Sequence, residues 1–112
     1  MKVKLFDLET IPAYPLHEKE KNVFYHTEAF KARIIELPPG GEIPPCAMPQ
    51  HVIFTVVKGE AHITVDGKTA TAAKGCCCIT GPATVSMKTE EGVRIMAIQI
   101  DADTALPSGP RE

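Results

Sequence analysis

The sequence predicts an all-β protein of 112 residues with one domain, built as an antiparallel sandwich or barrel. Apolar and polar residues alternate over many short segments, which is the periodicity of a strand. Turns containing glycine or proline separate these segments at intervals of about 8–12 residues, as in small all-β folds. No segment has the pattern of a helix of ordinary length.

The N-terminal part of the chain is expected to contain one irregular strand followed by a loop. Residues 3–8 alternate imperfectly, which suits an edge strand, and Pro12 and Pro15 end this pattern. The segment 17–22 is rich in Glu and Lys, so it is expected to be a solvated turn. The single domain, 1–112, is predicted to have three parts: an N-terminal strand and loop at 1–22, a core at about 23–100 and an unpacked tail at 101–112.

The predicted core consists of short strands joined by turns. Alternation and flanking turn residues place these strands at 23–26, 29–37, 51–58, 61–65, 69–73, 76–80, 84–89 and 93–100. The strand at 51–58 is apolar on both faces, so it is expected to be buried on both faces. Lys58-Gly59-Glu60 is predicted to be the turn that ends this strand.

Two local patterns predict the geometry of the connections. Pro44 and Pro45 cannot donate hydrogen bonds to a sheet, so the approach to Cys46 must lie at an edge or a bulge. Asp66-Gly67 is typical of the type I′ turn that joins two paired strands.

Composition and charge disfavour several classes of partner. The formal net charge of -2 and the pI near 6.1 give no basic field that would attract nucleic acid or an anionic membrane. The first residues acquire Asp7 and Glu9 before any apolar stretch develops, so no signal peptide is expected. No run approaches the roughly 18 apolar residues of a membrane span, and a cytoplasmic location is expected.

The four cysteines do not form the pattern of a disulfide framework. Cys76, Cys77 and Cys78 are consecutive, and on a strand Cys77 would face away from its two neighbours. No Cys-x-x-Cys pair indicates structural zinc or a redox pair. These thiols and that of Cys46 are therefore interpreted as free, small apolar side chains in a reducing compartment.

The segment from Gly40 to Gly59 has the spacing of a known motif. Gly40, Cys46, Met48, Val52 and Gly59 fall on the positions of Gly-x5-His-x-His-x3-4-Glu-x6-Gly. This resembles the first motif of the cupin superfamily, and in particular its small single-domain, cupin 2-type conserved barrels. The resemblance implies a double-stranded β-helix, or jelly-roll, barrel.

The chain resembles the second cupin motif less closely. That motif would begin at Gly75, and its histidine position falls on Ser86 by strict counting or on Val85 by strand alternation. The metal ligands of the family are therefore missing from both motifs, which makes the metal-binding motif degenerate. A typical divalent metal is not expected; a soft ion such as copper, held by Cys46, Met48 and His51, is the alternative.

A pocket is expected at the mouth of the barrel. Its predicted residues are Cys46, Met48, His51, Phe54, Val85, Met87 and Arg33. Regular alternation turns His51 away from the side of Val52, whereas a bulge after Pro49 would re-aim it inward. Both orientations stay open on the sequence.

Three functions are compatible with these patterns. The first is a barrel that binds a small organic molecule without a typical metal. The second is an enzyme that uses Cys46, Met48 and His51 with a soft metal, or Cys46 as a reactive thiol beside His51. The third is a structural dimer module. A homodimer is expected, with apolar residues of the outer sheet face meeting a partner: Ile53, Thr55, Val57, Ile98 and Ile100. The segment 3–8 could add to a neighbouring sheet edge.

Overall fold

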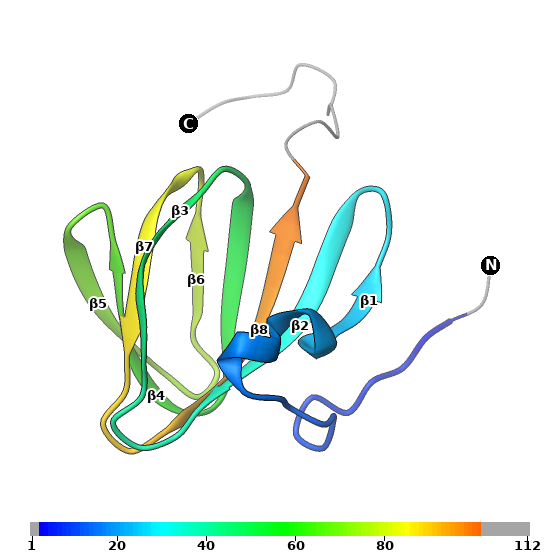
Figure 1. The fold of residues 1–112 in the computed structure, drawn as a ribbon, viewed down its shortest axis with the longest axis horizontal. Helices are drawn as coiled ribbons and strands as arrows, with labels where there is room; N and C mark the ends of the chain where they lie inside the picture. Colours follow the sequence, from blue (N-terminus) through cyan, green and yellow to red (C-terminus); the bar gives the residue numbers. More distant parts are fainter. Residues whose placement is uncertain (1–2, 102–112) are drawn as a thin grey trace.

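Eight strands and one short 3₁₀ helix make up the computed structural model, which describes residues 3–101 (Figure 1). The strands form a curled antiparallel sheet in the order β1-β2-β8-β4-β7-β3, and β5 and β6 each pair with β4. The elements are η1 (Leu16–Asn22), β1 (Val23–His26), β2 (Phe30–Leu37), β3 (Glu42–Met48), β4 (His51–Val65), β5 (Lys68–Ala73), β6 (Cys77–Thr80), β7 (Ala83–Lys88) and β8 (Val93–Ile100). The predicted all-β barrel is confirmed.

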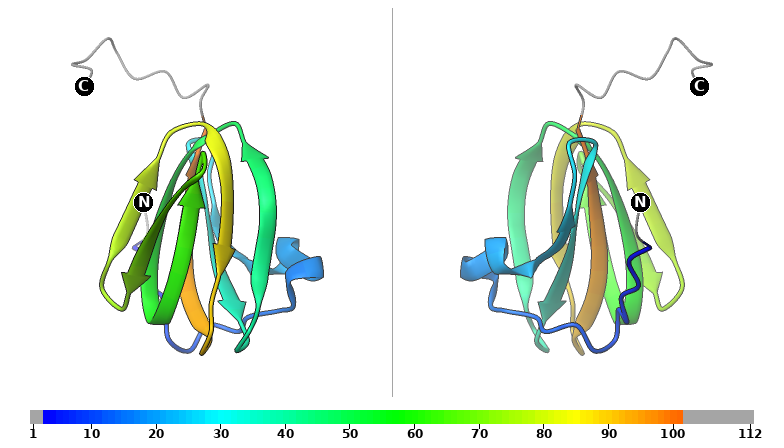
Figure 2. Two further views of the ribbon diagram at one scale, coloured as in Figure 1. Left: turned by 90° about the vertical axis from the view of Figure 1, so that its left-hand side faces the viewer. Right: turned by 90° about the vertical axis from the view of Figure 1, so that its right-hand side faces the viewer.

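The long strand β4 belongs to both layers of the barrel, which Figure 2 shows facing each other. Its first part pairs with β8 and β6, and with β1 and β2 these strands form sheet A. Its last part pairs with β5 and β7, and with β3 these strands form sheet B. The predicted turn at Lys58-Gly59-Glu60 is wrong, because a bulge between Val56 and Lys58 bends the strand without ending it.

The two local predictions about connections are confirmed. Within residues 3–101, β3 is an edge strand that pairs with β7 alone, and its register shifts between Ile43 and Cys46. Pro44 and Pro45 occupy this irregular stretch, where no ladder hydrogen bond is required of them. The β4–β5 hairpin turns at Asp66-Gly67, where φ is 47° and 86°, as a type I′ turn requires.

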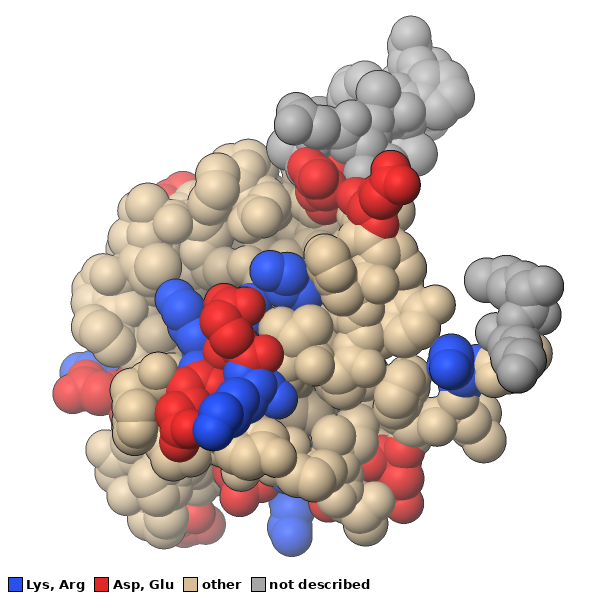
Figure 3. Space-filling model, turned by 45° about the vertical axis from the view of Figure 1, so that its right-hand side comes forward, with Lys and Arg blue, Asp and Glu red and all other residues tan. Residues whose placement is uncertain are grey.

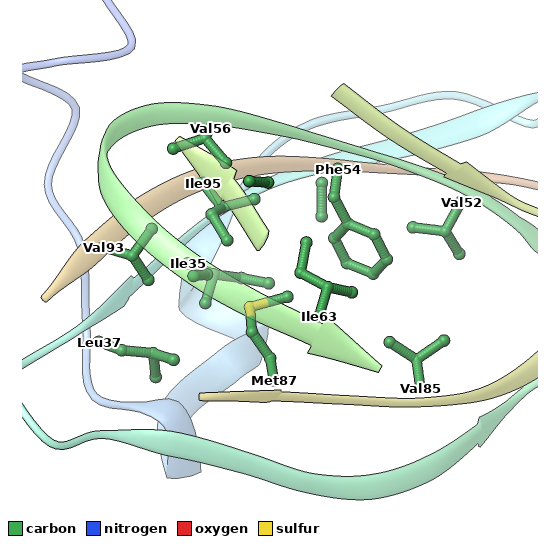
Figure 4. Close-up of a cluster of buried hydrophobic side chains, with 13 residues drawn as sticks. Ile35, Leu37, Val52, Phe54, Val56, Ile63, Val85, Met87, Val93 and Ile95 are labelled. Carbon is green, nitrogen blue, oxygen red and sulfur yellow. The ribbon is translucent and has the colours of Figure 1, made fainter. Parts of the chain in front are cut away.

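The side chains that point between the two layers form the hydrophobic core (Figure 4). Met87 of β7 lies beside Ile63 of β4, and Ile35 and Ile95 extend toward them from the opposite sheet. Ile63, Met87 and Ile95 are almost fully buried. Burial of one such side chain contributes roughly 1.5–3 kcal/mol, so this cluster is the main source of stability in the barrel.

The outer face of sheet A is also largely apolar. Its half-buried residues include Ile53, Val57, Met96, Ile98 and Ile100. Ile53 on β4 is the direct register partner of Ile98 on β8, so these two side chains lie next to each other on this face. The sequence-based prediction that β4 is apolar on both sides agrees with this arrangement.

The prediction of a strand at 3–8 is wrong, because the described residues of this segment form no sheet pairing. Asp7 instead begins a turn, in which its carbonyl oxygen accepts hydrogen bonds from the N–H groups of Thr10 and Ile11. Phe6 packs edge-on against Phe24, with 4.8 Å between the ring centroids. The Asp7 turn and this aromatic contact hold the segment against the barrel. The alternation of apolar and polar residues does not reveal either feature.

The charged segment near residue 20 is also more ordered than expected. It forms η1, in which Lys21 and Glu18 make an ion pair with 2.6 Å between Nζ and Oε1. Asn22 is buried at its end, where its side chain accepts a hydrogen bond from the N–H of Tyr14 and donates one to the Tyr14 carbonyl. The predicted exposure holds for His17, Lys19, Glu20 and Lys21, but an ordered 3₁₀ helix attached through Asn22 replaces the predicted turn.

Candidate functional site

A cavity of about 220 Å³ lies between sheets A and B. Six of the seven predicted pocket residues line it: Cys46, Met48, Phe54, Val85, Met87 and Arg33. Other side chains around it come from Ile35, Ile43, Ala97, Gln50, Ser86 and Gln99. The lining is mostly apolar with a few polar groups, which is the usual character of a site for a small organic molecule.

Strand register explains why these residues meet. Cys46 of β3 is the direct partner of Val85 on β7, so both residues belong to the sheet B wall. On the opposite wall Ala97 of β8 is the register partner of Arg33 on β2 and of Phe54 on β4. Because Ala97 has a small side chain, the two larger side chains flank a space on the inner face of sheet A.

Arg33 is a polar residue in this wall whose hydrogen bonding is incomplete. Its Nε atom is buried and has no hydrogen-bond partner. Among residues 3–101, the ion pairs of arginine involve Arg94 and not Arg33. A buried donor without a partner is destabilising by about 1–3 kcal/mol, so this guanidinium is open to an acceptor that enters the cavity.

The helix η1 forms part of the cavity wall that the sequence did not predict. Leu16, Lys19, Glu20 and Asn22 all line the cavity. Figure 3 shows basic and acidic side chains gathered together on the face where η1 lies. The one signal in the sequence was the apolar Leu16 ahead of the charged run, and it is too weak to identify a pocket residue.

His51 is the predicted pocket residue that does not line the cavity. It is exposed at the start of β4, whereas the next residue, Val52, is fully buried. Regular alternation therefore applies, and no bulge re-aims the imidazole inward. Its Nε2 lies over Gly81, 3.5 Å from the position a Cβ would take there. The inclusion of His51 in the pocket is wrong, so the proposed pairing with Cys46 has no support in this geometry.

The consecutive cysteines lie outside the cavity. Cys76 and Cys77 are exposed, and Cys78 packs partly against the core. Burial, together with the neighbouring Cys77, raises the pKa of the Cys78 thiol. Because the thiolate is the reactive form, a raised pKa makes Cys78 a poor nucleophile. This agrees with the interpretation of Cys78 as a small apolar side chain.

Two larger hollows lie elsewhere on the molecule. One, of about 610 Å³, is lined by charged residues of strands and loops, among them Glu36, Lys58, Glu90 and Arg94. The other, of about 600 Å³, includes His26 and Lys31. Neither is lined by the predicted pocket residues, so the cavity between the sheets is the candidate site.

Comparison with known families agrees with this geometry. The family model described as "Cupin domain" matches residues 33–86, the range that contains the first motif and most of the cavity strands. The chain belongs to the cupin superfamily. No curated protein sequence matches this cupin.

Solved structures support the same fold. This cupin is similar to the TT1209 protein of Thermus thermophilus, with a TM-score of 0.76, 16% identity and coverage of 88% of this chain and 97% of that one. The Cnp3 cupin domain of Schizosaccharomyces pombe gives a TM-score of 0.65 and 24% identity, with coverage of 72% of this chain and 59% of that one. An RmlC-like cupin from Shewanella frigidimarina gives a TM-score of 0.65 and 21% identity, with coverage of 70% of this chain and 72% of that one.

The residues of this cupin do not fit a typical divalent metal. The ligand positions of the family carry Cys46, Met48, Val52 and Val85, and the register of Val85 opposite Cys46 selects Val85 over Ser86. Val52 is fully buried and Val85 is 4% exposed, so both are core side chains. Within residues 3–101 no three His, Cys, Asp or Glu side chains are grouped as ligands. Hard and borderline ions need such oxygen and imidazole donors.

The described part of this cupin, residues 3–101, contains no helix that is both long and apolar enough to cross a membrane.

Proposed function

We propose that this cupin binds a small organic molecule in the cavity between its sheets, without a typical divalent metal. The observation that carries this proposal is that the family's metal-ligand positions hold apolar or soft side chains that line or adjoin a mostly apolar cavity. The volume of about 220 Å³ is smaller than the roughly 300–1,000 Å³ of sites for drug-sized ligands. The ligand is therefore a compact molecule.

The methionines provide a direct test. The chain has four, and Met48 and Met87 line the cavity, whereas Met96 lies on the outer face of sheet A. In protein labelled with ¹³C at the methionine methyl groups, benzyl alcohol is expected to shift the Met48 and Met87 signals and to leave Met96 unchanged. Equal shifts at all three positions would indicate nonspecific binding and contradict the proposal.

Substitutions in the cavity wall are expected to change binding more than stability. Cys46→Ser and Met48→Leu conserve side-chain volume, and Cys46 is exposed, so each should alter the unfolding free energy by less than about 1.5 kcal/mol. Each should change the affinity for benzyl alcohol measured at Met87, whereas Met96→Leu should not.

A chelator is the control for metal dependence. EDTA is expected to change neither the melting temperature nor the titration with benzyl alcohol. A bound metal would stabilise the folded state by mass action, so a sharp fall of the melting temperature on adding EDTA would overturn the metal-free proposal.

We also propose that the protein forms a homodimer through the outer face of sheet A. Ile53 and Ile98 are neighbours on this half-buried apolar face, and the N-terminal segment presents Val3 and Leu5, which are 89% and 92% exposed. A second copy of the chain would remove both apolar surfaces from water at roughly 25 cal/mol per Å².

Charge on this face is expected to prevent the association. Ile53→Lys with Ile98→Lys should produce a monomer by light scattering at micromolar concentration, while the exposed Thr71→Lys on sheet B should leave the dimer unchanged. A wild-type protein that is already monomeric under these conditions would contradict the proposal.

A further inference from the structure

The cavity wall has a cationic side chain, that of Arg33, next to apolar side chains. Arg33 lies on its inner face between β1 and β8, where it pairs in register with Val23 and Ala97. The apolar surface near it comes from Ile35 and Phe54. A guanidinium is permanently charged, so a site with this composition can hold an anionic group at one end and an apolar body at the other.

Within residues 3–101, no acidic side chain neutralises Arg33. Its Nε is buried without a hydrogen-bond partner. Glu20 is the one acidic residue of the cavity lining, and it is exposed on η1, with no ion pair to Arg33 in the described part of the chain. The Asn22 side chain bonds the Tyr14 backbone instead, since its oxygen accepts from the Tyr14 N–H and its nitrogen donates to the Tyr14 carbonyl.

We propose that the ligand of this cavity is a small organic acid, whose carboxylate binds Arg33 and whose apolar body packs against Phe54, Met48 and Met87. This inference rests on the proposed function and names its ligand class. A carboxylate supplies two acceptor oxygens in the geometry of the guanidinium fork, and it satisfies the buried Nε. The apolar side chains around it lower the local dielectric constant, which strengthens this charge-assisted hydrogen bond.

A pair of probes of nearly the same shape tests the role of charge. Benzoate and benzamide differ in one carboxylate oxygen replaced by an amide nitrogen, so both should fit the cavity, and only benzoate is an anion at neutral pH. Titrations followed at the Met87 methyl signal are expected to show benzoate binding about tenfold more tightly or better, as expected of a charge-assisted hydrogen bond. Benzyl alcohol serves as the neutral reference.

Two substitutions distinguish a direct bond between the ligand and Arg33 from general electrostatic attraction to the cavity. Arg33→Gln is expected to abolish the preference for benzoate while leaving benzamide binding and the melting temperature nearly unchanged, because the guanidinium has no partner to lose. Lys19→Gln removes an exposed cation at the same cavity and is expected to preserve the preference. The Met96 signal reports whether each variant keeps the wild-type fold.

The possible outcomes distinguish this inference from the proposed function. Equal affinities for benzoate and benzamide, or a preference that survives Arg33→Gln or is lost in Lys19→Gln, would overturn the assignment of a carboxylate to Arg33 while cavity binding stands. Failure of all three probes, benzoate, benzamide and benzyl alcohol, to shift Met48 and Met87 would contradict the proposed function itself.

Discussion

Gly59→Ala is expected to lower the free energy of unfolding by roughly 3 kcal/mol or more. Gly59 has a φ of 82° at the bend of β4, and a Cβ there would lie 2.2 Å from the carbonyl oxygen of Gly92. The contact cannot relax easily, because hydrogen bonds hold the opposing loop in place: Thr89 Oγ1 donates to the Glu60 carbonyl and accepts from the Gly92 N–H. Urea unfolding measures the loss.

Gly75→Ala is the matched control for this prediction. Gly75 has nearly the same φ, 89°, but a Cβ would meet nothing within 4 Å. This variant is therefore expected to lose only the roughly 1–2 kcal/mol of a left-handed backbone conformation. An equal loss in the two variants would show that the close approach of Gly59 to Gly92 does not determine the stability of the bend.

Gly59 also shows why the course of β4 could not be predicted from the sequence. A glycine between a lysine and a glutamate predicts a turn, and the same residues serve equally well in a bulge that lets one strand continue into a second sheet. The choice between these depends on the loop at Gly92, which is distant in sequence. By contrast, Pro44, Pro45 and the Asp66-Gly67 pair restrict the backbone locally, so their structures could be predicted.

The candidate site was predictable to the extent that it lies on regular strands. Met48, Phe54, Val85 and Met87 line the cavity because alternation and the spacing of the glycines fix the direction of their side chains. His51 would line the cavity only if a bulge turned it inward, and the strand is regular there. The residues contributed by η1 could not be predicted, since that segment reaches the cavity through tertiary contacts rather than through a periodic pattern.

Arg94→Leu is expected to lower the free energy of unfolding by about 2–3 kcal/mol. Arg94 is 7% exposed and bonds three groups from distant parts of the chain. Its Nε donates to the Leu8 carbonyl at 2.7 Å, its guanidinium also donates to the Ile11 carbonyl, and Nη1 pairs with Glu36 Oε1 at 2.7 Å. Leucine would leave both carbonyls without this donor and would release the N-terminal segment from β8.

Glu36→Gln separates the ion pair of Arg94 from the hydrogen bonds that Arg94 donates to the two N-terminal carbonyls. The Glu36 side chain is 53% exposed, so the charge of this ion pair is screened by water, and its loss should lower stability by less than about 1 kcal/mol. The amide oxygen can still accept from Nη1. If the bonds to the N-terminal carbonyls dominate, the nuclear Overhauser contact between Phe6 and Phe24 should persist in Glu36→Gln and weaken in Arg94→Leu. Similar losses of stability in both variants would assign the effect of Arg94 to the ion pair instead.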